Sequence, residues 1–223
     1  MTLPSSPRIR AGALAASLLV MAAAGLSAHS PPATAFLPEE IVEWEEQVFS
    51  GATPYRLVDV DGRDAVQALC EDETASALFH RADIDLTETP VMEWSWRVDA
   101  TLAGIDETST SGDDFPARLY VVAQRRILRW RPIAINYVWA HEKPEGADWP
   151  NPYSSQVRMV SVRSGPPMQE GRWFTERRNV REDLRRFHGR DVTVLGVVAI
   201  MTDCDDTGQR SEGWYGTIRF VPE

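Results

Sequence analysis

Five aspartates form the group of side chains best suited to bind a cation: Asp113, Asp114, Asp203, Asp205 and Asp206. The last three belong to the segment 203–208, which reads Asp-Cys-Asp-Asp-Thr-Gly and follows an apolar run. Carboxylate oxygens are the hard ligands that Ca²⁺ prefers. The spacing of an EF-hand is absent, however, and Asp, Thr and Gly are also the residues of ordinary turns. The sequence leaves two interpretations, a Ca²⁺ site and a solvated turn with side-chain-to-backbone hydrogen bonds.

Aromatic side chains on a polar loop form a second candidate group. The chain contains eight tryptophans, and one of them, Trp149, lies close to Tyr153 in a proline-containing polar segment. Exposed rings of this kind can stack on sugar rings or other flat apolar ligand faces. Trp94 and Trp96, in contrast, belong to an alternating run that predicts a core position. We predict that Trp149 and Tyr153 contact a ligand.

A polysaccharide lyase would need an Asn or Arg that neutralises a carboxylate, beside a Tyr or His base. Arg118, Asn136, Tyr137 and His141 have the side chains for these roles. Asn136 and Tyr137 are neighbours on a predicted strand, so their side chains point to opposite faces, which argues against one shared site. The motifs Gly-x-Ser-x-Gly, P-loop and His-Glu-x-x-His are absent from the sequence. The sequence therefore favours a binding role, with Arg118 and Asn136 as candidate ligand-binding residues and no catalytic residue assigned.

Seven arginines lie between Arg172 and Arg190, around a predicted helix. Their guanidinium groups could hold a uronate or a sulfate by bidentate pairing. The same segment contains Glu176, Glu182 and Asp183. These acids favour the other interpretation, a solvated helix face with balanced charge.

The N-terminal 35 residues have the composition of a signal peptide. Arg8 and Arg10 precede an apolar run over residues 11–25, and Ala33-Thr34-Ala35 supplies small residues at alternate positions. Cleavage there leaves residues 36–223 as a single domain, which we expect in the periplasm or secreted. An earlier cut after Ala28 is the other possible site, although Leu26 fits it less well. An uncleaved anchor is the alternative, but the apolar run is shorter than the roughly 20 residues that a membrane span needs.

The net charge of the chain limits which partners it can bind, and its cysteines bear on the compartment in which it works. The formal net charge is −10, and the predicted signal carries two arginines and no acid, so the remaining domain is still more acidic. A negative surface disfavours nucleic acids and anionic membranes as partners. Cys70 and Cys204 are the only cysteines. They can form one disulfide in an exported protein, and their spacing alone does not decide whether they do.

Alternating apolar and polar residues predict an all-β domain. In Val91–Val98, Met92, Trp94, Trp96 and Val98 point to one face and polar residues to the other. Similar short runs are Tyr55–Val60, Ala75–His80, Arg118–Ala123, Ile133–Ala140, Val157–Arg163, Arg172–Arg177, Val192–Thr202 and Trp214–Val221. With turn-rich connections between them, these runs indicate a sandwich or barrel rather than alternating β and α units. We expect a jelly-roll-like β-sandwich.

Two segments have helical signals. A capping box at Asn179 and Glu182, apolar residues at helical spacing and Gly189 as a stop predict one short helix near residues 180–188. Residues 38–49 fit either a short amphipathic helix or a segment that leads into the domain.

Several segments occur together in an order typical of one family. They are Trp94-Ser-Trp-Arg-Val98, the run from Gly112 to Val121, Asn136-Tyr-Val-Trp139, Asn151-Pro-Tyr153, the run from Gly171 to Val180, and the run from Ile200 to Gly208. From about Trp44 to Phe220, the sequence resembles the domain-of-unknown-function family 3047 of exported bacterial proteins. The resemblance implies an exported single-domain β-protein without an established activity. The family's acidic motif typically reads Asp-Thr-Asp-Asn-Thr-Gly, and here Cys204 and Asp206 replace Thr and Asn.

Together these observations predict an exported β-sandwich protein that binds a carbohydrate or another envelope ligand. Two other functions stay open because the fold alone supports none of them over the others. One is a polysaccharide-active lyase or hydrolase, which would release unsaturated products or reducing ends. The other is an envelope protein whose partner is a second protein, which mild cross-linking would capture.

Overall fold

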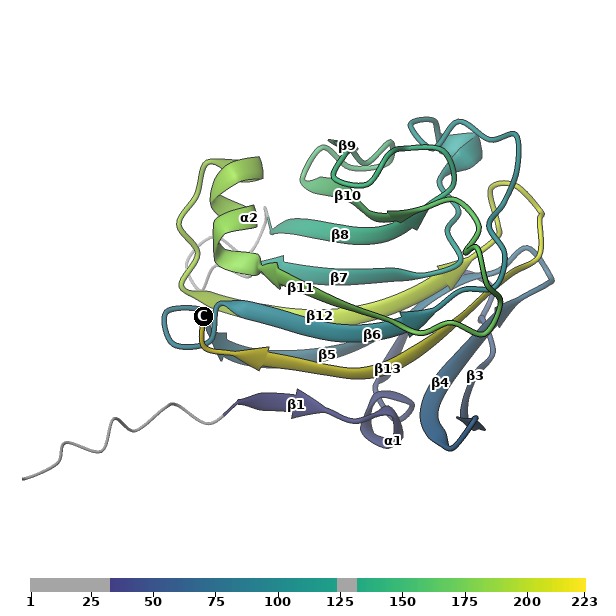
Figure 1. Ribbon diagram of the computed structural model, residues 1–223. Coiled ribbons are helices and arrows are strands. Elements are labelled where there is room, and N and C mark those ends of the chain that lie inside the picture. Colours follow the sequence, from purple (N-terminus) through teal and green to yellow (C-terminus); the bar gives the residue numbers. More distant parts are fainter. Residues whose placement is uncertain (1–32, 124–131) are drawn as a thin grey trace, which may run out of the picture.

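The computed structural model describes residues 33–123 and 132–223, which form two β-sheets packed face to face (Figure 1). This is the jelly-roll-like β-sandwich that the sequence predicts. The helices are α1 (Pro38–Ile41), a short 3-10 helix (Thr110–Gly112) and α2 (Val180–His188). None of the described helices is long and apolar enough to cross a membrane.

The six-stranded sheet has the order β11-β6-β13-β4-β3, and β1 also pairs with β13. Its strands are β1 (Thr34–Phe36), β3 (Tyr55–Val60), β4 (Arg63–Cys70), β6 (Val91–Arg97), β11 (Phe174–Asn179) and β13 (Ser211–Val221). All of its pairings are antiparallel. Both β1 and β4 use one edge of β13, β4 near its start and β1 near its end.

The seven-stranded sheet has the order β2-β5-β12-β7-β8-β10-β9. Its strands are β2 (Glu45–Ser50), β5 (Ala75–Asp85), β7 (Arg118–Ala123), β8 (Ile133–Ala140), β9 (Asp148–Pro150), β10 (Val157–Ser164) and β12 (Val194–Asp203). The pair β8 and β10 is parallel, and the other pairs are antiparallel. This sheet carries the candidate site on the face turned away from the core.

The core lies between the two sheets and is built by the predicted alternation. Met92, Trp94 and Trp96 of β6 are fully or almost fully buried. The Trp94 ring packs against Tyr137 of the opposite sheet, with 5.5 Å between ring centroids. Burial of large aromatic rings across the interface is the main stabilising contribution in such a sandwich.

All nine predicted strand runs overlap observed strands, and β3, β7 and β8 match their predicted bounds. The strands β1, β2, β4 and β9 were not predicted. In the segment 38–49, only α1 is helical; a turn follows at residues 42–44, and β2 begins at Glu45. All six residues of β2 are exposed on the edge of the sheet, so they lack the alternation that signals a strand.

The helix α2 confirms the prediction for residues 180–188. The Asn179 side chain accepts a hydrogen bond from the Glu182 amide at 3.1 Å, and Gly189 ends the helix in the left-handed conformation. Val180 and Leu184 are buried against the core.

A disulfide joins the two sheets. Cys70 is the last residue of β4, Cys204 directly follows β12, and their Cα atoms are 5.9 Å apart. The bond closes a loop with a sequence separation of 134 residues. In the chain-entropy model, a loop of this length stabilises the fold by roughly 5 kcal/mol. The disulfide therefore anchors the acidic turn, residues 203–208, to the six-stranded sheet.

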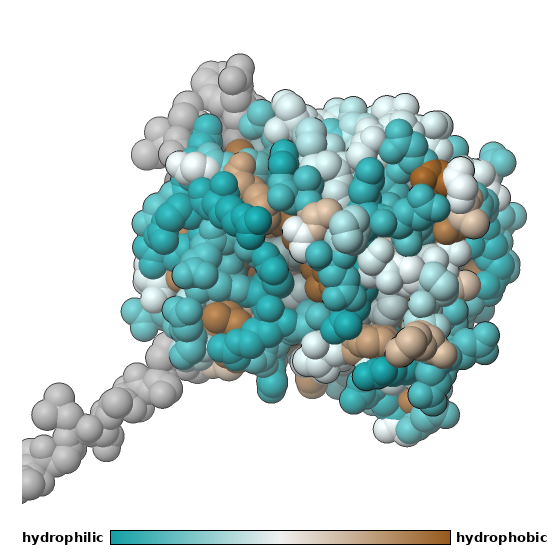
Figure 2. Space-filling view, turned by 45° about the horizontal axis from the view of Figure 1, so that its top comes forward, coloured by the Kyte–Doolittle hydropathy of each residue, from teal (hydrophilic) through white to brown (hydrophobic). Residues whose placement is uncertain are grey.

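The view in Figure 2 shows a largely hydrophilic face with small, separate hydrophobic patches. Such scattered patches are normal for a folded domain and do not mark a binding site.

Candidate functional site

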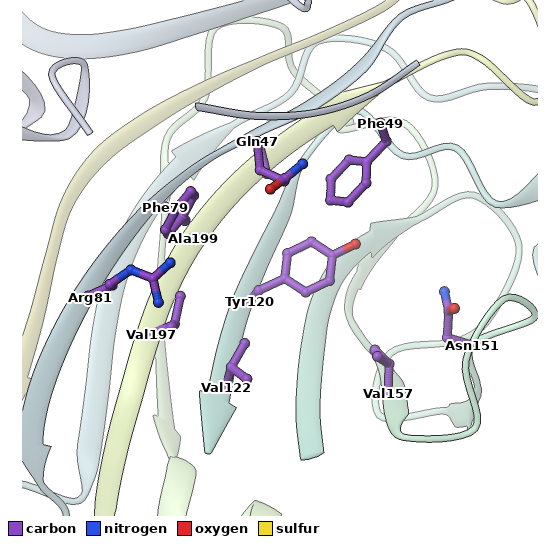
Figure 3. A pocket seen from close by; sticks show the side chains of 11 residues that line it. Gln47, Phe49, Phe79, Arg81, Tyr120, Val122, Asn151, Val157, Val197 and Ala199 are labelled. Atoms are coloured by element: carbon purple, nitrogen blue, oxygen red, sulfur yellow. The ribbon is translucent and has the colours of Figure 1, made fainter. Parts of the chain in front are cut away.

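A groove of about 420 Å³ crosses the outer face of the seven-stranded sheet (Figure 3). Along β7, Leu119 and Val121 point into the core, so Tyr120 and Val122 point into the groove. Residues of β2, β5, β12 and β10 line it as well, together with Asn151 in the β9–β10 connection. The groove therefore runs across the strands rather than along one of them.

Three aromatic rings from three strands lie along this groove. They are Phe49 of β2, Phe79 of β5 and Tyr120 of β7 (Figure 3). The Phe49 side chain is 66% exposed, although large apolar residues are usually buried. Gln47 and Asn151 add amide groups to the lining. Aromatic faces with amides beside them can hold a ligand that has apolar faces and polar edges.

A second hollow of about 340 Å³ continues the groove toward the acidic turn. The two hollows share Phe49, Tyr120 and Asn151 as lining residues. Tyr153 and Asp206 line the second hollow. The outer face thus carries one continuous depression with an aromatic part and an acidic part.

A buried ion-pair network forms the base of the acidic part. Arg118 donates to both carboxylate oxygens of Asp203, with 2.9 Å from Nε to Oδ1, and its Nη1 donates to Asp113 at 3.3 Å. Asp113 also accepts a hydrogen bond from the Asn151 amide at 2.9 Å. Burial raises the pKa of the Asp203 carboxyl, and the ion pair with Arg118 opposes this rise. The network holds three elements in fixed positions around the hollow.

The structure divides the five aspartates for which the sequence leaves a Ca²⁺ site and a solvated turn as interpretations. Asp113 and Asp203 are ion-paired with Arg118 and do not belong to the group of converging carboxylates. Asp114, Asp205 and Asp206 instead bring one carboxylate oxygen each within 4.8 Å of the others. Burial and repulsion between the carboxylates raise the pKa of Asp205. These three are the aspartates that could hold a cation, and its binding stays a prediction.

The two aromatic residues predicted to contact a ligand have different surroundings. Trp149 is only 6% exposed, packs with Phe115 and Met159, and donates its indole N–H to the Glu107 carbonyl at 2.9 Å. Pairing of β9 with β10 turns this side chain inward, so Trp149 offers no free face for stacking. Tyr153 is 62% exposed, and its hydroxyl donates to Asp206. Only Tyr153 is accessible to a ligand.

The residues considered for a lyase site do not lie together. Asn136 points to the outer face, and neither atom of its buried amide has a hydrogen-bond partner among the described residues. Tyr137 points to the core and donates to Asp183 at 2.8 Å, as expected for the opposite face of the strand. His141 is buried and lines neither hollow. Of the four, Arg118 alone lines the depression, where it is paired with Asp203.

The arginines around α2 are largely paired with acids. Arg178 bonds to Asp183, and both Arg181 and Arg185 bond to Asp191. The charges are thus partly balanced, but Glu176 and Asp183 are buried rather than solvated. The exposed pairs are formed with Asp191, which was not among the predicted partners.

Sequence reasoning missed the aromatic lining of the groove. Phe79 lies in a predicted strand, but its side of the strand is not evident without the partner strands. Phe49 belongs to the segment 38–49, in which no strand was predicted. The signal that could have identified these phenylalanines is their position on the outward side of a strand. Its use requires knowing which face of the strand is buried.

Solved structures with a similar chain course include two carbohydrate-binding modules and one glycosidase. The family 11 module of the cellulosomal cellulase Lic26A-Cel5E of Clostridium thermocellum is 8% identical, with a TM-score of 0.46 over 86% of this chain and 95% of that chain. The low-affinity xylan-binding module CBM86 from Roseburia intestinalis is 10% identical, with a TM-score of 0.36 over 86% and 96%. The family GH12 endoglucanase 3 of Trichoderma harzianum is 8% identical, with a TM-score of 0.38 over 81% and 98%. Likeness at this level carries no argument about function.

No curated protein matches the sequence. A family model described as "Protein of unknown function (DUF3047)" matches residues 42–219, which is most of the chain and includes both hollows. The chain belongs to the DUF3047 family, as its motifs predict.

Proposed function

We propose that this protein binds a glycan chain in the depression across the outer face of the seven-stranded sheet. The observation that carries the proposal is the lining of the groove, in which Phe49, Phe79 and Tyr120 lie beside the amides of Gln47 and Asn151. Sugar rings have apolar C–H faces and hydroxyl edges. Aromatic faces can stack on the C–H faces of a sugar, and amides can donate hydrogen bonds to its hydroxyl groups and accept hydrogen bonds from them.

The shape of the depression supports a chain rather than a single small molecule. The two hollows meet at Tyr120, so the depression extends from β2 and β5 to the loop that carries Tyr153. A linear oligosaccharide laid across the strands would contact both parts. Tyr153 is then an accessible ring at the acidic end, in place of the buried Trp149.

A binding role accounts for the buried carboxylates better than catalysis does. Arg118 bonds to both oxygens of Asp203 and to one oxygen of Asp113, so in this proposal these carboxylates support the site rather than exchange protons with a glycosidic oxygen. In this proposal, the network of Arg118 is a support that positions Asn151 and Tyr120 at the junction of the hollows.

We place this binding outside the cytoplasm. The N-terminal 35 residues have the features of a signal peptide, and a buried disulfide is typical of proteins in oxidising compartments. Periplasm and extracellular space are both compatible with these features. Fractionation of cells that express the full chain, with N-terminal sequencing of the product, tests the location and the cleavage.

The binding test uses the domain from residue 33, which keeps β1 whole, with its disulfide formed, on a panel of polysaccharides followed by calorimetry. We expect binding to at least one glycan, and a loss of about tenfold in affinity for Phe79→Ala or Phe49→Ala, equivalent to about 1.4 kcal/mol. Leu57→Ala is the matched control, because Leu57 is 46% exposed on the six-stranded sheet. Absence of binding to any glycan, or binding that both phenylalanine variants retain, would overturn the proposal.

The same samples separate the other two functions. Release of reducing ends or of unsaturated sugars from a bound polysaccharide would make the protein an enzyme. Capture of an envelope protein that Phe49→Ala abolishes, without any glycan binding, would make the groove a protein-interaction surface.

A further inference from the structure

Arg81 differs from the rest of the groove lining in its charge. Among the described residues it is the only charged one that lines the aromatic hollow, and it extends from β5 over the neighbouring strand β12 (Figure 3). Around it lie Phe79, Val197 and Ala199, whose side chains are apolar. A cation here is unexpected in a chain whose formal net charge is −10.

Arg81 has no ion-pair partner in the part of the chain that the structure describes. Among the described residues, no Asp or Glu oxygen lies within 4.0 Å of its guanidinium group. The residues outside the described ranges, 1–32 and 124–131, contain no Asp or Glu at all. Within the described part of the chain, Arg81 therefore has an unpaired charge and makes no side-chain hydrogen bond.

The guanidinium group also has a defined position. Its central carbon lies 5.3 Å from the centroid of the Phe79 ring, which is within the range of a cation–π contact. Contact with the ring leaves the N–H donors at the edge of the guanidinium plane available. A planar guanidinium with free edges binds carboxylate or sulfate oxygens in pairs, which a lysine cannot do.

Charge of the opposite sign marks the other end of the depression. Asp205 and Asp206 line the acidic hollow, and no ion pair to either is present among the described residues. Tyr120 lies between the two ends, since it lines both hollows. The depression is thus positive at Arg81 and negative at the acidic turn.

From this arrangement we infer that the glycan carries an anionic substituent, a uronate carboxylate or a sulfate, at the Arg81 end and uncharged sugars at the acidic turn. The inference rests on the proposed function and adds the class of glycan. It favours a polymer that mixes charged and neutral sugars over one that is charged at every residue, because the latter would meet Asp205 and Asp206.

The test compares polysaccharides with their chemically neutralised forms. Glucuronoxylan is set against its carboxyl-reduced product, and a sulfated galactan against its desulfated product, with calorimetry at low and high salt. We expect one charged form to bind about tenfold more tightly than its neutral partner, with a preference that shrinks as salt rises. The pair that shows the preference identifies carboxylate or sulfate as the recognised group.

Arg81→Gln is expected to abolish this preference, so that the charged and the neutral form of the polysaccharide bind with equal affinity. Arg81→Lys should restore only part of it. Arg56→Gln is the matched control, because Arg56 is an exposed arginine of β3 on the six-stranded sheet. Since Arg81 is exposed, the melting temperature of each variant should stay unchanged and report an intact fold.

Equal affinity for charged and neutral forms, with binding still lost in Phe79→Ala, would overturn this inference and leave the proposed function in place. A preference that Arg81→Gln retains would also overturn it. Binding to neither form of either polysaccharide, and to no other glycan, would overturn the proposed function itself.

Discussion

Arg118 on β7 and Asp203 at the end of β12 form a two-point ion pair that is almost completely buried beneath the acidic hollow. The two residues are separated by 85 positions in the chain and are brought together by the pairing of β7 with β12. Asp203 also accepts the backbone N–H of Phe115 at 3.0 Å. This ion pair connects the core of the sandwich to the surface that we propose binds a glycan.

Removal of one partner of this pair should be far more harmful than removal of both. We expect Asp203→Ala to lower the free energy of unfolding by about 3–5 kcal/mol, because the buried Arg118 charge loses its main partner. The double variant Asp203→Leu with Arg118→Met should recover most of that loss. Urea unfolding of the single and double variants measures the difference, and equal loss in both would contradict a coupled pair.

The stability of the protein should depend on the ionisation of Asp205. Burial first, and then repulsion by Asp206 and Asp114, raise the pKa of Asp205 above its unfolded value. The folded state therefore binds the proton of the Asp205 carboxyl more tightly than the unfolded state does. Above the folded pKa, the ionised carboxylate lowers the stability of the fold, and this loss of stability disappears as pH falls to the unfolded pKa. Asp205→Asn should therefore be more stable than the wild type at pH 7 in EDTA.

The same variant defines the pH window. The stability difference should shrink as pH falls through the folded pKa of Asp205 toward about 4, near the unfolded value. Thermal melts of both proteins across this range measure the difference. A constant difference at all pH values would show that Asp205 titrates as it does in the unfolded chain.

Millimolar Ca²⁺ is expected to raise the melting temperature of the oxidised domain relative to EDTA. Asp114, Asp205 and Asp206 converge at one point, and occupancy at a hundred times the dissociation constant would add about 2.7 kcal/mol. Asp205→Asn should abolish the shift. Asp64→Asn, at an exposed position of β4, should retain it. No shift in the wild type would make this segment an ordinary turn.

Trp149→Ala should act on stability rather than on ligand contact. Its ring is buried with Phe115 and Met159, so truncation creates a cavity that costs about 3–5 kcal/mol. Tyr153→Ala should change stability by less than about 0.5 kcal/mol, as expected for an exposed side chain, but should weaken glycan binding. Chemical unfolding and calorimetry on both variants distinguish the two roles. The reverse pattern would contradict the assignment.

Asn136→Leu should raise the free energy of unfolding by about 1–2 kcal/mol, because the buried amide has no partner among the described residues. The two side chains are similar in size, so the packing should survive. A destabilised variant would show that the amide is satisfied in solution, for example by a buried water molecule.

The sequence by itself determined the elements that depend on local pattern. Alternation in Val91–Val98 and Ile133–Ala140 predicted strands, and the cap at Asn179 with the stop at Gly189 predicted α2, because these signals are contained in a few consecutive residues. The family membership followed in the same way, from motifs along one chain. Strand β2 was not predicted, because an exposed edge strand has no buried face and therefore shows no alternation of apolar and polar residues.

The site depended on the tertiary structure. Strand pairing decided that Trp149 turns inward, that Arg118 occupies Asp203, and that Phe49, Phe79 and Arg81 share one face of the sheet. These residues are far apart in sequence, and the face of a strand that becomes solvent-exposed is set by its neighbours rather than by its own residues. Residue types predicted which side chains could bind a ligand, but only the pairing of the strands determined which of these side chains lie close together.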